Sequence, residues 1–213
     1  EHEACGVGFV ADIMGRRSHA IIADGRTVLE NMSHRGARGA EPNTGDGAGI
    51  LIQIPHNFFS YTTQQLNIHL PLPGAYGVGM VFLPRDAARR VECEAAFAAI
   101  VAAEGQALLG WRDVPTDNAA LGATAVRSEP VMRQVFIGRD QGLSDDPLAF
   151  ERKLFVIRRL VEKQIGRDAS EGDAAFYIAS LSSRTTIYKG MLLAEQLRGY
   201  FPDLSHPLID SAI

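Results

Sequence analysis

The spacing of apolar residues along the chain predicts four helices. The strongest pattern follows Pro147, where apolar side chains recur at intervals of three and four residues. They are Phe150, Leu154, Ile157, Val161 and Ile165. The other predicted helices span 19–32 with Ser18 as N-cap, 86–104 with Asp86 as N-cap, and 192–200 before Pro202. The expected inner face of the 86–104 helix consists of Ala87, Val91, Ala95, Ile100 and Val101.

Short apolar runs between these helices predict strands. They span 5–11, 48–54, 76–83, 107–114, 131–138, 174–182 and 185–189. The last two are expected to pair as a hairpin across Ser183 and Arg184. Because several strands lie close in sequence, the pattern favours a mixed or antiparallel sheet covered by helices. This is an α+β arrangement and not a doubly wound parallel sheet.

Composition and charge exclude several classes of protein. The 213 residues are 46% hydrophobic and 22% charged, which is typical of a soluble globular domain. A formal charge of −4 argues against a nucleic-acid binder, and the longest apolar run, 95–103, is too short to span a bilayer. Two cysteines form neither a disulfide framework nor a metal site, which predicts a reducing, intracellular setting. Both ends of the sequence have the character of cut ends, which suggests a piece of a longer polypeptide.

Cys5 is the leading candidate for chemistry, because it opens a glycine-flanked strand near the start of the chain. One interpretation is a small buried thiol in a core strand. The other is a nucleophile: if residues 1–4 were removed, the freed α-amine, with a pKa of about 7.7–8.0, could take the thiol proton. Gly6 and Gly8 would then leave room for a substrate. Cys93 lies between two glutamates in a predicted helix and is interpreted as structural.

A glycine-rich loop is the second candidate, and it contains Gly45, Asp46, Gly47 and Gly49. It lacks the lysine and the spacing of a phosphate-binding loop and precedes a strand, so a nucleotide site is not favoured. Its glycines are expected to supply positive φ angles or close packing. Arg35, followed by Gly36, ends the first helix, either as a cation favoured by the helix dipole or as a substrate ligand.

Together, these motifs resemble one family. The run CGVGF at 5–9, HRGA at 34–37 and TGDGAGI at 44–50 are similar to the start of glutamate synthase large subunits. The similarity continues through residues 190–192, 196–197 and 200–204, and thus across essentially the whole chain. In that family, this region is a class II glutamine amidotransferase domain of the N-terminal-nucleophile type.

The resemblance implies a fold and a site. The fold is a four-layer αββα sandwich with mixed and antiparallel sheets, of which residues 5–213 form the N-terminal part and residues 1–4 a propeptide remnant. Cys5 matches the nucleophile that attacks the carboxamide of L-glutamine, releasing ammonia and leaving a thioester for water to hydrolyse. Arg35 matches an arginine of the glutamine pocket. A supporting loop consists of Gly36, Gly45, Asp46, Gly47 and Gly49, and no metal is implied.

The chain ends before several family motifs, namely the His-Ser-Arg-Phe-Ser-Thr segment, the Asn-Gly oxyanion pair and the Asp for the substrate amine. We therefore expect this fragment alone to be inactive. FMN and an iron–sulfur cluster belong to later domains, and no cofactor is expected on this chain. The implied partners are the synthase domains of the same polypeptide and a small reductase subunit, in the cytoplasm or, for a plant-type enzyme, the plastid.

Two alternatives to this function remain open. One is a catalytically silent, unprocessed module that keeps the fold and mediates interactions. The other is a different class II amidotransferase, such as the phosphoribosyl amidotransferase of the purine pathway. The long loop between Arg35 and Gly47 disfavours the latter.

Overall fold

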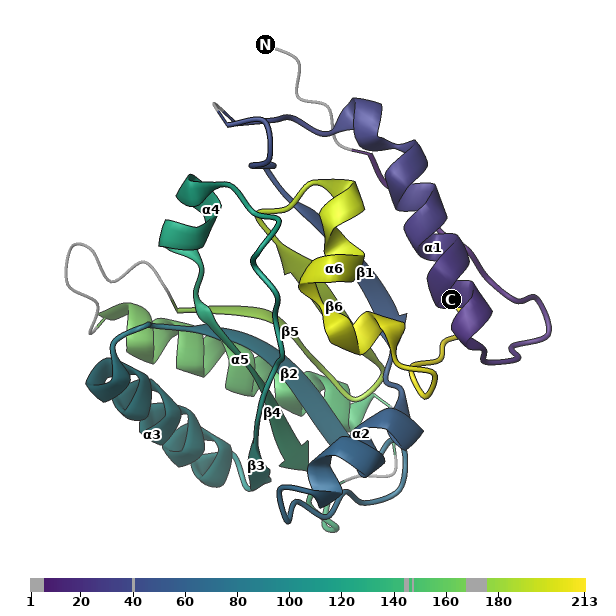
Figure 1. Ribbon diagram of the computed structural model, residues 1–213. Coiled ribbons are helices and arrows are strands. Elements are labelled where there is room, and N and C mark those ends of the chain that lie inside the picture. Colours follow the sequence, from purple (N-terminus) through teal and green to yellow (C-terminus); the bar gives the residue numbers. More distant parts are fainter. Residues whose placement is uncertain (1–5, 40, 144–145, 147, 168–175) are drawn as a thin grey trace. The chain divides into compact units, whose positions relative to one another are not determined.

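The chain divides into two compact units, each assembled from separate stretches of sequence (Figure 1). The computed structural model describes residues 6–39, 41–143, 146, 148–167 and 176–213. Unit 1 comprises Glu1–Phe58, Val114–Glu129 and Ile187–Ile213, and unit 2 comprises Phe59–Asp113 and Pro130–Thr186.

Unit 2 is organised around a four-stranded antiparallel sheet. Its strands are β2 (Tyr76–Leu83), β3 (Ala107–Asp113), β4 (Val131–Gly138) and β5 (Tyr177–Ser182), in the order β3-β4-β2-β5. The central pair, β2 and β4, runs in unbroken register from Tyr76 opposite Gly138 to Leu83 opposite Val131. All three pairings are antiparallel, so the expected antiparallel sheet in an α+β fold is confirmed.

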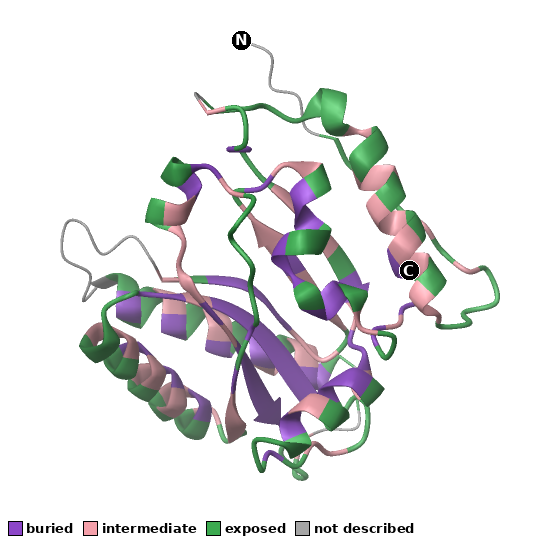
Figure 2. Cartoon of the chain, viewed as in Figure 1, coloured by how far each residue is buried: buried purple, intermediate pink, exposed green. Residues whose placement is uncertain are grey.

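Two helices cover this sheet and form the core of unit 2. They are α3 (Ala87–Ala103) and α5 (Ala149–Arg167), and the five apolar residues that predict α5 are all buried. Gly77 on β2 lets α5 approach closely, because an added Cβ would lie 2.6 Å from Leu154 Cδ1. In Figure 2, β2 and β4 are coloured as buried along most of their length.

The start of α3 is predicted well, but its inner face is not. The Asp86 carboxylate caps the helix by accepting a hydrogen bond from the Arg89 amide at 2.8 Å. The buried face, however, is formed by Cys93, Phe97 and Val101. Of the expected residues, Val101 is buried, Ile100 is partly buried, and Ala87, Val91 and Ala95 are exposed. Alanines on most sides of this helix weaken its pattern, so the large Phe97 side chain decides which face turns inward.

A two-stranded sheet consists of β1 (Ala48–Gln53) and β6 (Thr185–Gly190), of which β1 and the residues of β6 from Ile187 onward belong to unit 1. The helix α1 (His19–Asn31) packs on β1, where a Cβ added to Gly25 would lie 3.3 Å from Ile50 Cδ1. Ser18 precedes α1 in extended conformation, as expected of an N-cap, but its side chain makes no capping hydrogen bond. The remaining elements of unit 1 are short: η1 (Ser33–Arg35), α4 (Ala123–Ser128), η2 (Ala194–Gln196), α6 (Leu197–Tyr200) and η3 (Pro202–Ser205).

The predicted hairpin of the last two strands is wrong, because β5 pairs with β2 and β6 pairs with β1 in separate sheets. At the end of β5, the Glu151 carboxylate accepts hydrogen bonds from the Ser183 amide at 2.6 Å and from the Ser182 hydroxyl. These contacts hold the end of β5 on α5. Proximity in sequence indicated a turn here, but it did not determine the pairing.

Residues 6–12 form no regular strand, although residues 5–11 are predicted as one. Val7 and Phe9 are more than 90% exposed, and Gly8 lies against α1, where a Cβ would be 2.6 Å from Val28 Cγ1. A strand needs a hydrogen-bonded neighbour, and a run of small apolar residues does not supply one. Cys5 lies outside the described residues.

Three smaller differences concern helices. The predicted helix over 192–200 is divided into η2 and α6, and Pro202 begins η3. The helices α2 (His56–Gln64) and α4 are not predicted, because nine and six residues are too few to show a helical period.

No helix in the described part of the chain combines the length and apolar character needed to cross a bilayer.

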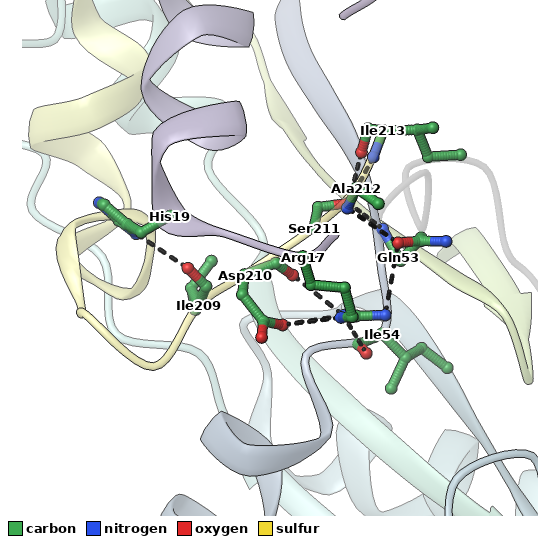
Figure 3. Close-up of polar contacts among 9 residues, drawn as sticks. All are labelled: Arg17, His19, Gln53, Ile54, Ile209, Asp210, Ser211, Ala212 and Ile213. Atoms are coloured by element: carbon green, nitrogen blue, oxygen red, sulfur yellow. Dashed lines mark hydrogen bonds and ion pairs between the residues drawn. The ribbon is translucent and has the colours of Figure 1, made fainter. Parts of the chain in front are cut away.

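Polar contacts fasten the last described residues to unit 1 (Figure 3). The Arg17 guanidinium donates to the Asp210 carboxylate at 3.0 Å and to the Ile54 carbonyl at 2.8 Å. The Ala212 amide donates to Gln53 Oε1 at 2.9 Å. The segment at 209–213 is thereby fixed beside the start of α1 and the end of β1.

Candidate functional site

A cavity of about 140 Å³ in unit 1 brings the sequence motifs together. Its walls come from the residue after Cys5, the end of α1, the loop that follows it and the η2 region. The lining residues are Gly6, Leu29, Met32, Ser33, Arg35, Gly36, Ala37, Arg38, Asp46, Gly47, Ala48, Leu192, Leu193, Ala194 and Glu195. We call this space the site cavity.

Gly6 and Arg35 are packed against each other at the site cavity. A Cβ added to Gly6 would lie 3.1 Å from Arg35 Cβ and 3.4 Å from Met32 Sδ. The residue that follows Cys5 therefore touches η1 directly. Instead of leaving open space for a substrate, as expected, Gly6 and Gly8 allow this segment to lie close to α1 and η1.

Arg35 offers the site cavity a positive charge that no other described residue pairs with. It ends η1, and its side chain is exposed. Among the described residues, its guanidinium makes no hydrogen bond or ion pair. An arginine in this state can bind a carboxylate through two parallel hydrogen bonds, which favours the ligand interpretation over a purely helix-capping role.

Asp46 holds one wall of the site cavity together. Its Oδ1 accepts a hydrogen bond from the Ala37 amide at 3.1 Å, and its own amide donates to the Ala37 carbonyl at 3.2 Å. Farther along the loop, the Gly39 amide donates to the Thr44 carbonyl at 2.8 Å. The described residues 37–39 and 41–46 thus run antiparallel to each other, and we call these two segments the wall hairpin.

The glycines of the predicted supporting loop differ in why, and whether, the structure requires glycine at their positions. A Cβ on Gly45 would collide with the Leu192 carbonyl and lie 2.6 Å from the Leu193 amide nitrogen. Gly47 has a φ of +152°, which L side chains rarely adopt. Gly49 lies against β6, where a Cβ would be 2.6 Å from Lys189 Cβ. Gly36 has an ordinary φ of −85° and nothing closer than 3.6 Å, so it has room for a side chain.

Glu41 was missed by the sequence analysis, although it fixes the tip of the wall hairpin. Its carboxylate accepts hydrogen bonds from the Thr124 amide at 3.0 Å, the Thr124 hydroxyl at 3.0 Å and the Thr44 hydroxyl at 2.8 Å. These hydrogen bonds, that of the Thr124 amide above all, lower the pKa of the Glu41 carboxyl. An ionised acceptor is therefore favoured at this position.

Gln196 is a second residue whose role was missed. Its side-chain amide nitrogen donates to the Asn43 carbonyl at 2.9 Å and to the Ala120 carbonyl at 2.8 Å, and its oxygen accepts from the Leu193 amide at 2.8 Å. The side chain is buried, and it joins three backbone segments around the site cavity. The resemblance includes Gln196 in its matched motifs, which was the only signal for it in the sequence.

One ion pair lies at the rim of the site cavity. Arg38 Nη2 is 3.5 Å from Glu195 Oε1, and both side chains are at least half exposed. Such exposed pairs contribute little to stability, typically below about 1 kcal/mol. Of the two arginines that line the cavity, Arg38 thus has an ion pair with a described residue and Arg35 has none.

A larger cavity of about 360 Å³ in unit 1 shares Gly6, Leu29 and Met32 with the site cavity. All of its lining residues are apolar or glycine, so it offers no charged side chain for binding or proton transfer. Within the described ranges, no cluster of three or more histidine, cysteine or acidic side chains could hold a metal ion.

The comparisons with known proteins agree on one family. The family model of class II glutamine amidotransferases matches residues 5–213. The chain is 44% identical over 212 residues to the large chain of glutamate synthase [NADPH] from Bacillus subtilis, covering 100% of this chain and 14% of that protein. It is 40% identical over 206 residues to the Azospirillum brasilense large chain, covering 96% and 13%.

A plant relative gives a similar result. The chloroplastic ferredoxin-dependent glutamate synthase 2 of Arabidopsis thaliana is 38% identical over 214 residues, covering 99% of this chain and 13% of that protein. The chain thus spans about one seventh of the length of the curated relatives it matches.

Proposed function

The chain belongs to the class II glutamine amidotransferase family, and we propose that it forms the glutaminase part of a glutamate synthase large chain. In this function, L-glutamine is hydrolysed to glutamate and ammonia through a thioester on Cys5. The observation that carries the proposal is the site cavity, which unites Gly6, next to Cys5, with Arg35 and the wall hairpin.

The proposed chemistry begins with attack of the Cys5 sulfur on the carboxamide carbon of glutamine. The sulfur–carbon bond forms, the carbon–nitrogen bond breaks, and the nitrogen leaves as ammonia after it receives a proton. Water then hydrolyses the thioester to glutamate. Removal of residues 1–4, the proposed propeptide remnant, would free an α-amine that accepts the thiol proton; as an amide, the same nitrogen has no basic lone pair.

Arg35 is the proposed ligand of the substrate's α-carboxylate. Its guanidinium lines the cavity beside the residue that follows Cys5 and is free of ion pairs with other described residues. Gly36, Gly45, Asp46, Gly47 and Gly49 act as support, since they shape the loop and its packing without supplying a reacting group.

The proposed partners lie in the rest of the polypeptide. The ammonia would feed the amination of 2-oxoglutarate in synthase domains, where FMN and an iron–sulfur cluster would be held, with a small reductase subunit as electron source. This chain has only two cysteines, whereas an iron–sulfur cluster needs several. We propose a cytoplasmic location, or a plastid location for a plant-type enzyme.

The proposal is tested by measuring glutamate formation from L-glutamine in the full-length polypeptide. We expect Cys5→Ala to lower kcat by at least about 10³-fold, because the nucleophile is lost. Cys93→Ala is the matched control: Cys93 is buried in the core of unit 2, and its loss should leave the rate nearly unchanged.

Two results would contradict this assignment. Wild-type activity in Cys5→Ala would exclude Cys5 as the nucleophile. A folded wild-type protein with no glutaminase activity, and with Glu1 still at its terminus, would favour the catalytically silent module instead.

A further inference from the structure

The wall hairpin is anchored at both of its ends. At its open end, Ala37 and Asp46 pair with each other and line the site cavity. At its tip, the Thr44 amide donates to the Glu41 carbonyl at 3.2 Å and closes the turn. An isolated two-stranded hairpin is only marginally stable in water, so contacts at the tip contribute to the order of the whole wall.

The tip contacts come from a segment about 80 residues farther along the chain. The Glu41 carboxylate accepts three hydrogen bonds, two of them from Thr124, which lies 83 residues later in sequence. The Gly122 amide also donates to the Asn43 carbonyl at 3.1 Å. We call this set of hydrogen bonds the Glu41 staple.

The lack of space for a side chain at Gly122 independently indicates how tightly the Glu41 staple is packed. A Cβ at Gly122 would collide with Thr44 Oγ1 and Glu41 Oε2. Its φ of −70° and ψ of 153° suit any L-amino acid, so the backbone does not require glycine there. The staple itself requires it, because only glycine lets the carboxylate and the Thr44 hydroxyl approach so closely.

We propose that Glu41 is a positioning residue for glutamine binding, an inference that rests on the proposed function. Glu41 does not line the site cavity. It acts through the wall hairpin, whose open end carries Arg38 and is separated from Arg35 in sequence by Gly36 alone. Fixing the tip keeps this wall in place, so the staple affects binding of glutamine more than the chemistry at Cys5.

The hydrogen-bond pattern distinguishes geometry from charge at Glu41. In Glu41→Gln, the amide oxygen can accept from the Thr124 amide and the Thr44 hydroxyl, while the amide nitrogen donates to the Thr124 hydroxyl. The staple therefore survives in this variant. In Glu41→Ala both acceptor oxygens and with them all three hydrogen bonds are lost, and in Gly122→Ala the added methyl group displaces the carboxylate.

The test uses the full-length polypeptide and measures kcat and KM for L-glutamine. We expect Glu41→Ala and Gly122→Ala each to raise KM by about tenfold, with kcat changing by less than about threefold, because a loss of uniform binding appears in KM. Glu41→Gln should stay near the wild type. Gly199→Ala is the matched glycine control, since a Cβ there meets nothing within 4 Å.

An unchanged KM in folded Glu41→Ala and Gly122→Ala would overturn the proposal, and so would a fall in kcat alone. If the wild type does not hydrolyse glutamine, the proposed function fails, but the staple is still tested by amide hydrogen exchange. Exchange at Ala37 and Asp46 should become faster in Glu41→Ala and not in Glu41→Gln. Equal exchange rates at Ala37 and Asp46 in all variants would refute the proposed role of the Glu41 staple.

Discussion

Apolar packing and polar contacts contribute differently to the internal structure of each unit. In unit 2, side chains such as Phe97, Leu154 and Val135 form one continuous apolar cluster between the sheet and its helices. Unit 1 has apolar core residues as well, but its site is shaped by Glu41 and Gln196, whose polar atoms bond to distant backbone. The comparison teaches that unit 2 depends on the packing of many apolar side chains, whereas the site in unit 1 depends on individual acceptors and donors.

The largest effect is expected when the core of unit 2 is opened. Phe97 is fully buried and packs edge-on against Trp111, with ring centroids 5.3 Å apart. Phe97→Ala should lower the free energy of unfolding by about 3–5 kcal/mol. Urea unfolding followed by the fluorescence of Trp111, the only tryptophan, measures this.

Phe155→Ala provides the control for that change, because Phe155 lies on α5 and the residue is 62% exposed. Its loss should cost less than about 1 kcal/mol. Similar costs for the two variants would contradict the description of unit 2 as the apolar centre of stability.

An intermediate effect is expected in the supporting loop of unit 1. Gly45→Ala forces a methyl group against the Leu192 carbonyl and the Leu193 amide, and backbone atoms cannot swing aside as a side chain can. We expect a loss of about 1–3 kcal/mol in unfolding free energy. Gly36→Ala in the same loop, where the nearest atom is 3.6 Å away, should change it by less than about 0.5 kcal/mol. Equal losses in thermal or urea unfolding would show that close packing is not what requires glycine at position 45.

The smallest effect is expected from the titration of Glu41. Its hydrogen bonds lower the pKa of the folded-state carboxyl below the usual value of 4.5. The ionised form therefore stabilises the folded state above pH 4.5, and this contribution is lost as the pH falls through the lower folded-state pKa. Arg127, whose charge also favours ionisation of Glu41, adds to the same trend.

Glu41→Gln cannot titrate, so it isolates this contribution. The difference in melting temperature between the wild type and Glu41→Gln should shift against the wild type between about pH 6 and about pH 3. A difference that stays constant over this range would mean that the Glu41 charge is not coupled to folding.

Much of unit 2 could be predicted from the sequence, because its signals are local. The apolar repeat from Phe150 to Ile165 and the runs that form β2 and β4 identify these elements. The prediction of the buried face of α3 was wrong because the alanines of this helix give a weak apolar pattern. The predicted pairing of β5 with β6 was wrong because the tertiary fold, and not proximity in sequence, determines which strands form hydrogen bonds with each other.

The site was predictable where residue type carries the signal. Arg35, Gly36, Asp46 and Gly47 stood out as motifs, and all four line one cavity. Gln196 could not be found as an anchor, because the two carbonyls that its amide nitrogen binds lie 76 and 153 residues away. A polar side chain gives no indication in the sequence of which distant carbonyl it will meet.

The Arg17–Asp210 contact has a consequence for the order in which the molecule is made. Its two residues are separated by 193 positions, so the contact cannot form before residue 210 has left the ribosome. Unit 2 has all of its residues once position 186 has been synthesised, whereas unit 1 still lacks Ile187–Ile213. Since Leu192–Glu195 line the site cavity, that cavity can be completed only after all residues of unit 2 have been synthesised, when its sheet scaffold is already able to form.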